Sequence, residues 1–464
     1  MTWGGLLSKL VGLILILPLI LKFFPTEDIV LWYSLTSVLS IIIMFDLGFS
    51  PTFVRFYSYV LGGADISKLA NLKAKHENNN NCIDSESFEF INIYIKSIYK
   101  KVSIIAFLLI SIFGSIALIG PISKSSNLVE GSIAWFVIIL SGIITLYGNR
   151  FTSALQALNK ISLYQRYVIL TTVISTSIAA ILIPIYQSLL VTIICIQFGA
   201  LIGVAVNYKL FKQCYLKIDI RNQGVNVKDA KFKNVRIEIN KSAYKSAIGV
   251  FCSTGIFQFS NLVVANSFEK TLSSGYMIAM QLLRSLSAFS QVPISTQIPI
   301  LSKLYVNGDL AVLFSKLKVI TLKVLVVFLF GLLILSLGIS KLFHILESDT
   351  QPPSAFVWCT LALAIGFERL FSVLVQVFSL TNEIVWDKIN GMTALVVTLS
   401  TITFYNSLGI QAFSLSFFIA YVFIYSTMAV LYTRSFIENH LLKLVLFAAA
   451  FMVGLVTFIY HFIY

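Results

Sequence analysis

The chain has 464 residues, of which 58% are hydrophobic and 12% are charged, and its mean hydropathy is +0.89. Soluble domains carry roughly a quarter charged residues, so this composition excludes a globular soluble enzyme. The formal net charge of +14 would favour nucleic-acid binding in a soluble protein, whereas in a membrane protein it reflects basic cytoplasmic loops. We therefore expect an all-α polytopic membrane protein with no nucleic-acid partner.

Apolar stretches long enough to cross a bilayer, which takes roughly 20 residues, recur along the whole chain. The N-terminal stretch is interpreted as a retained helix, because no small-residue cleavage site follows it. The stretches predict twelve core transmembrane helices and a thirteenth, whose final YHFIY is equally compatible with a position along the membrane interface. They lie at 6–24, 29–50, 101–120, 131–153, 165–185, 188–208, 244–266, 272–300, 319–340, 354–380, 389–406, 411–432 and 441–462.

A polar gap after the sixth stretch divides these helices into two groups of six, as in transporter folds built from parallel repeats. Helix 2, with Pro51 and Arg55, matches helix 8, with Arg284, Pro293 and Pro299, in its position within each group. The expected organisation is an N-terminal six-helix lobe at 1–208, a basic cytoplasmic linker at 209–243, a C-terminal six-helix lobe at 244–432 and a C-terminal segment with the extra helix at 433–464.

The distribution of basic residues predicts the orientation. If the N-terminus is cytoplasmic, 25 of the 34 Lys and Arg residues fall in cytoplasmic connections. Only Lys22, Lys124, Lys270 and Lys341 fall in the turns on the other, non-cytoplasmic side of the membrane, as the positive-inside rule requires. The connection at 209–245 has ten basic and three acidic residues, and we expect it to contact anionic membrane lipids of the inner leaflet.

Cysteine and histidine give no sign of a special site. The five cysteines are scattered without a CxxC spacing, and the four histidines do not cluster. The sequence therefore predicts no disulfide framework, no metal site and no cofactor.

Seven charged residues remain in the predicted helices, five of them basic: Lys9, Asp46, Arg55, Arg150, Arg284, Glu368 and Arg369. Arg284 and Arg369 lie near the middle of their helices, where a charge is costly unless it faces a wet cavity or a partner. The other basic residues lie nearer the cytoplasmic helix ends. An alternative for those three is that their side chains only extend to the lipid headgroups.

Helix 2 combines a proline with two charges. Pro51 removes a helical hydrogen bond and is the candidate hinge. Asp46 and Arg55 would lie on opposite faces of a straight helix, so we do not expect them to pair. Asp46 and Glu368 are candidates for coupling to a proton or Na⁺, although Glu368 is also placed to neutralise a nearby arginine in a structural pair.

The basic residues, which come from helices 1, 2, 4, 8 and 10, predict a positive, water-filled cavity between the lobes. Guanidinium groups bind phosphate through two parallel hydrogen bonds and stay protonated, so the expected ligand is a diphosphate. The candidate substrate-binding residues are Arg284, Arg369, Arg55, Arg150 and Lys9.

Several motifs fit one family. The segments EDIVLWYSLTSV (27–38), FDLGFSPTFVRF (45–56) and RFTSALQALNKISLYQRY (150–167) make the chain resemble the polysaccharide (O-antigen) flippases of the MATE-like multidrug/oligosaccharidyl-lipid/polysaccharide exporter superfamily. The resemblance implies a bacterial inner-membrane carrier that moves an undecaprenyl-diphosphate-linked oligosaccharide, a unit for O-antigen, lipopolysaccharide or capsule, by alternating access. It also implies arginines from helices 2 and 8, here Arg55 and Arg284, in a cationic cavity. Other polysaccharide-assembly membrane proteins are expected partners.

Other functions remain open from the sequence. A multidrug exporter of the same superfamily usually carries a buried acidic site, whereas the charges in these helices sum to +3. A membrane polymerase or ligase would need a sizeable periplasmic loop with catalytic residues. The turns on the non-cytoplasmic side are short, and His344 is the one histidine in them. No DxD, HExxH, GxSxG or phosphate-loop motif is present, so we expect a carrier and not an enzyme.

Overall fold

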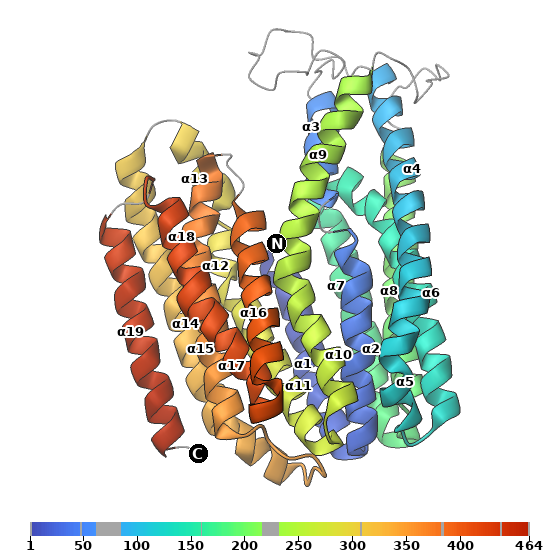
Figure 1. Ribbon diagram of the computed structural model, residues 1–464. Helices are drawn as coiled ribbons and strands as arrows, with labels where there is room; N and C mark the ends of the chain where they lie inside the picture. Colours follow the sequence, from blue (N-terminus) through green and yellow to red (C-terminus); the bar gives the residue numbers. More distant parts are fainter. Residues whose placement is uncertain are drawn as a thin grey trace.

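The computed structural model describes residues 2–46, 49–61, 85–158, 160–215, 232–306, 309–381, 385–436 and 439–462 (Figure 1). These residues form helices and short connections, and no strand occurs among them. Ten of the described helices are long and apolar enough to cross a membrane. The expected all-α, multi-pass membrane architecture is confirmed.

The first six predicted spans form the half of the molecule on the right of Figure 1. The third of them is longer than expected, because its helix starts at Ser85 and not near residue 101. The helices are α1 (Thr2–Phe23), α2 (Thr26–Met44), α3 (Ser50–Leu61), α4 (Ser85–Leu109), η2 (Ile110–Gly114), α5 (Ser115–Ser123), α6 (Leu128–Ala157), α7 (Ile161–Tyr186) and α8 (Leu189–Tyr215).

The remaining spans form the half on the left, except that the first of them, α9 to α10, runs between the halves. The predicted thirteenth span is a continuous apolar helix, α19, that packs on α14 and α15. The helices are α9 (Lys233–Val250), η4 (Phe251–Gly255), α10 (Ile256–Ser267), α11 (Lys270–Ser290), α12 (Val292–Ser295), α13 (Ile298–Val306), α14 (Leu310–Ile345), α15 (Ala355–Phe378), η5 (Ser379–Thr381), α16 (Trp386–Leu408), α17 (Gln411–Ile419), η6 (Ala420–Tyr425), α18 (Ser426–Thr433) and α19 (Asn439–Phe462).

The second helix of each half is broken at a corresponding place. In the first half α2 ends at Met44 and α3 begins at Ser50, so the helix expected at 29–50 ends earlier than predicted. In the second half the chain passes from α11 through the short α12 to α13. Pro51 lies in the first turn of α3, where a missing backbone N–H costs no helical hydrogen bond. Pro51 thus stands just after the break, and its role as a hinge stays a prediction.

A second hydrophobic core, here called the α9 cluster, lies apart from the main core and joins α9 to the first half. The rings of Phe90 and Phe232 stack at 4.0 Å in it, a contact that contributes about 0.5–1.5 kcal/mol beyond buried area. Its buried members are Phe53, Phe56, Tyr57, Val60, Phe88, Phe90, Ile91, Ile95, Tyr99, Ala154, Ala157, Phe232, Val235 and Ile239.

The far end of α9 packs on the second half. Asn390 of α16 donates a hydrogen bond of 3.1 Å to the carbonyl oxygen of Gly249. A Cβ atom at Gly249 would lie 3.3 Å from the backbone nitrogen of Asp387, so glycine permits this close approach. Helix α9 thus bridges the two halves, with its upper end beside α3 in Figure 1.

Candidate substrate cavity between the lobes

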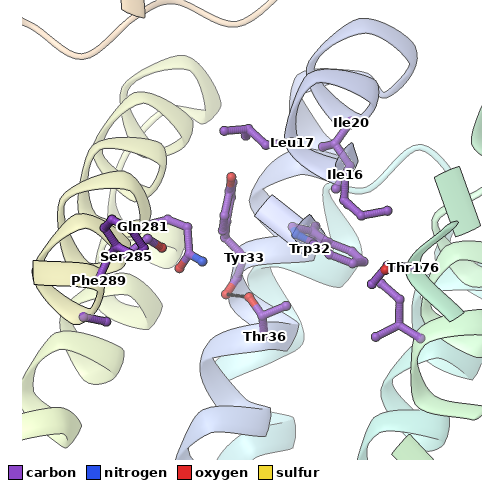
Figure 2. Close-up of a pocket in the computed structure, with 13 residues that line it drawn as sticks. Ile16, Leu17, Ile20, Trp32, Tyr33, Thr36, Thr176, Gln281, Ser285 and Phe289 are labelled. Carbon is purple, nitrogen blue, oxygen red and sulfur yellow. Dashed lines mark hydrogen bonds between the residues drawn. The ribbon is translucent and has the colours of Figure 1, made fainter. Parts of the chain in front are cut away.

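A cavity of about 370 Å³ lies between the two halves. Helices α1, α2, α7 and α8 supply one wall and α11 supplies the other (Figure 2). In Figure 2, Gln281 and Ser285 of α11 face Tyr33 and Thr36 of α2 across this space.

The described residues that line the cavity are neutral. Aromatic rings come from Trp32, Tyr33 and Phe289, and hydroxyl or amide groups come from several polar side chains. The full described lining is Gly12, Ile16, Leu17, Ile20, Trp32, Tyr33, Thr36, Thr176, Ile196, Gln281, Ser285, Ala288 and Phe289. Nothing in the sequence distinguishes these residues, because single aromatic and hydroxyl residues are common in membrane helices.

An ion pair lies inside the second half, beside the α11 wall. Arg284 Nη1 donates to Glu368 Oε2 at 3.1 Å, and the guanidinium lies 4.1 Å from the ring centroid of Phe257. The side chains of Arg284 and Glu368 are 29% and 15% exposed, so neither is fully enclosed by protein. The structure confirms that Glu368 neutralises a nearby arginine.

Arg369 lies next to this pair and is 6% exposed. Its Nε donates to Ser287 Oγ at 2.9 Å and its Nη1 to Ser372 Oγ at 3.4 Å. In the π-helical segment η6, the ring of Tyr421 stacks on that of Phe257, the ring beside Arg284, with the centroids 5.8 Å apart. π-Helical segments are rare in proteins as a whole, and those that occur are frequently found at functional sites.

Asp46 lies in the first half, at the break between α2 and α3, and is 7% exposed. Its carboxylate accepts a hydrogen bond of 2.5 Å from the hydroxyl of Tyr99 and one of 2.7 Å from the Nδ2 of Asn149. These contacts tie the break to α4 and α6. Whether Asp46 also couples transport to an ion stays a prediction.

We expect Asp46→Ala to lower the free energy of unfolding by about 2 kcal/mol or more. The change removes the acceptor of the buried Tyr99 hydroxyl and of the partly buried Asn149 amide, and an unpaired buried donor costs about 1–3 kcal/mol. Thermal unfolding of the purified protein in detergent measures the effect. Asp309→Ala is the control, because Asp309 is exposed and makes no capping hydrogen bond. Equal midpoints for the two variants would contradict the stabilising role.

The described candidate residues do not come together in the one positive cavity that the sequence predicts for them. Arg150 lies in the first half, with its guanidinium 4.2 and 4.4 Å from the ring centroids of Tyr147 and Phe151. The side chains of Lys9 and Arg55 lie outside the described part of the structure. Among the described side chains, the charges form separate groups in the two halves. The described residues also hold no group of three or more His, Cys, Asp or Glu suited to a metal ion.

A side-chain contact links the two halves at the end of the molecule where α2 begins. Lys270 Nζ, at the start of α11, donates to Glu27 Oε1 at 2.5 Å. We call this contact the α2–α11 gate. Farther along α2, Asn261 of α10 donates to Ser37 Oγ at 3.2 Å, and this pair is buried. The sequence predicts that Lys270 lies in a turn, but it carries no signal for the partner of this lysine.

The fold is similar to those of solved transporters. No protein-family description matches the chain, and no curated protein matches it. An inward-facing multidrug resistance MATE family transporter of the MOP superfamily aligns with a TM-score of 0.58 and 12% identity, and an outward-facing one with 0.58 and 13%. A MOP superfamily transporter from Pyrococcus furiosus, described by the reverse polarity of its binding pocket, aligns with 0.58 and 12%. Each alignment covers 96% of this chain and 95% of the other. At these identities the similarity shows the fold alone.

Proposed function

We propose that the chain carries an undecaprenyl-diphosphate-linked oligosaccharide across the bacterial inner membrane by alternating access. Its fold is that of MATE family transporters of the MOP superfamily, which have been solved in inward-facing and outward-facing conformations. Alternating access requires a central site that is open first to one side of the membrane and then to the other. A fold that adopts both conformations meets this requirement.

The lining of the central cavity carries this proposal. Carbohydrates offer apolar ring faces and many hydroxyl groups, which aromatic rings and neutral donors and acceptors bind. Trp32, Tyr33 and Phe289 supply the rings, while Gln281 and Ser285 supply the polar groups. A neutral aromatic and polar cavity between the lobes therefore suits the sugar part of the substrate.

Arg284 is the residue we assign to the diphosphate. It is adjacent in sequence to Ser285 of the cavity wall, and its side chain is 29% exposed. A diphosphate that approaches the wall can replace Glu368 as the partner of the guanidinium. The displaced carboxylate then becomes available to a proton or cation, which gives a route for coupling.

A cation-coupled multidrug exporter is the closest rival. Such a carrier needs a carboxylate facing its organic cation, and the described residues that line the cavity include none. One solved transporter with this fold is described by a reversed pocket polarity that suggests a different function. The fold therefore does not require a cationic substrate.

A membrane polymerase or ligase is supported less well. The described connections on the side of the α2–α11 gate are short, the longest running from Leu346 to Ser354. They offer no domain in which to build a catalytic centre. In the proposed orientation this is the periplasmic side, and the gate closes the cavity toward it.

Transport in reconstituted vesicles tests the function. We expect a fluorescent lipid-diphosphate oligosaccharide to become accessible on the opposite leaflet, and a cationic dye to remain where it is. Movement of the dye without the lipid-linked sugar would establish the rival exporter. Complementation of flippase-deficient strains with different repeat units would then identify the sugar.

Trp32→Leu is expected to slow sugar-lipid transport about 3- to 10-fold, because a ring-stacking contact contributes about 0.5–1.5 kcal/mol. Initial rates in vesicles with matched protein content measure the change. Phe136→Leu is the control, since Phe136 is 61% exposed on the outer face of α6. Equal rates for both variants would remove Trp32 from the substrate site.

A further inference from the structure

A second, smaller pocket of about 240 Å³ lies within the first half, among α3, α4, α6 and α8. None of its described lining residues lines the central cavity. Two of those residues are cationic, Lys96 of α4 and Arg150 of α6, and no acidic side chain occurs among them. The pocket is therefore a positive site separate from the cavity between the lobes.

The guanidinium of Arg150 packs against two aromatic rings of its own helix. The rings of Tyr147 and Phe151 lie 4.2 and 4.4 Å from it, whereas its N–H donors lie in the plane of the group. Its Nε is buried and has no hydrogen-bond partner, and no ion pair to Arg150 occurs among the described residues. The nearby carboxylate of Asp46 is already bonded to Tyr99 and Asn149.

Neutral polar groups complete the pocket. Tyr57 donates to Asn92 Oδ1 at 3.1 Å, which orients the amide and leaves its two N–H donors for another partner. The side chain of Tyr208 also lines the space. Lys96, exposed at the edge of the pocket, adds a mobile point charge. A fork-shaped donor, an ammonium group and neutral donors around one space are the groups that bind phosphate.

We propose that this pocket binds a phosphate-bearing ligand at a site distinct from that of the transported substrate. The ligand bridges Arg150 of α6 and Lys96 of α4, and Tyr57, which belongs to the α9 cluster, lies against it. Occupancy therefore stiffens the end of the first half on which α9 rests. The same chemistry is offered by an anionic phospholipid headgroup and by a free phosphate or diphosphate.

Binding of inorganic pyrophosphate to the full chain, in nanodiscs of neutral phosphatidylcholine, tests whether the ligand is a free phosphate or diphosphate. We expect a saturable calorimetric component that Lys96→Gln weakens at least tenfold and that Lys100→Gln leaves unchanged. Lys100 is an equally exposed lysine one turn further along α4, outside the pocket. Arg284→Lys should also leave this component intact, which separates it from binding in the central cavity.

Native mass spectrometry of protein from membranes that contain phosphatidylglycerol tests the lipid source. The pocket is a headgroup site if phosphatidylglycerol stays bound to the unchanged protein and to Lys100→Gln but is lost from Lys96→Gln. In that case no pyrophosphate binding is expected. Absence of both ligands overturns the proposal. Equal losses in the two lysine variants overturn it as well, because they indicate only diffuse attraction to a basic surface. Arg150→Lys, which keeps the charge and removes the fork, is expected to bind pyrophosphate more weakly than the unchanged protein.

Discussion

Arg284→Ala is expected to lower export of the lipid-linked sugar at least about 30-fold while the protein remains in the membrane. Removal of one partner from a hydrogen-bonded charge pair costs about 2–5 kcal/mol. The lower end of this range corresponds to about 30-fold in rate. Arg284→Lys should retain partial activity, because lysine keeps the charge and loses the bidentate geometry. Vesicle transport rates, normalised to protein recovered in the membrane, provide the measurement.

A double variant separates substrate binding from structural pairing. Arg284→Ala alone leaves Glu368 without the partner that it contacts at 3.1 Å, so a loss of activity has two explanations. Arg284→Ala combined with Glu368→Ala removes the stranded carboxylate. Recovery of export in the double variant would show that Arg284 only neutralises Glu368. Arg166→Ala, at an exposed arginine on α7, controls for the loss of a positive charge as such.

Cross-linking the α2–α11 gate is expected to stop transport almost completely. Cysteines that replace Glu27 and Lys270, in a chain without its five native cysteines, can be joined by a short cleavable thiol reagent. Alternating access requires this end to open, so the bridge holds the carrier in one state. Reduction of the bridge should restore transport.

The control pair lies at the same end of the molecule but within one half. Ser188, just before α8, donates a hydrogen bond of 2.7 Å to Glu130 in the first turn of α6. Cysteines at these two positions join helices that move together, so their cross-link should leave transport largely intact. Full cross-linking of Glu27→Cys to Lys270→Cys with undiminished transport would mean that the lobes do not separate at the gate.

The main features of the fold were predictable because membrane helices reveal themselves by length and apolarity. Each of the thirteen predicted stretches corresponds to helix in the structure, including the uncertain last one at Asn439–Phe462. The break after Met44 was harder to place, since the apolar character continues beyond it. Pro51 indicated that the helix is disturbed, and it lies in the first turn of α3, just after the break.

The sequence was enough to predict which charged residues belong to the candidate site, but not which residues they contact. Depth along the helices singled out Arg284 and Arg369, and the structure gives each of them a buried or half-buried polar environment. The partners of Arg369 are two serines, and nothing distinguishes Ser287 or Ser372 from other serines in the sequence. The contacts of Asp46 depend in the same way on which helices become neighbours in space.

The α9 cluster has a consequence for how the protein is made. Phe232, Val235 and Ile239, which complete this core, are synthesised after all six helices of the first half. A nascent chain that has reached Tyr215 therefore holds exposed aromatic surface on α3 and α4 that its own half cannot cover. We infer that the first lobe matures only when the next helix leaves the translocon, so the two lobes are assembled as successive, dependent steps and not as independent units.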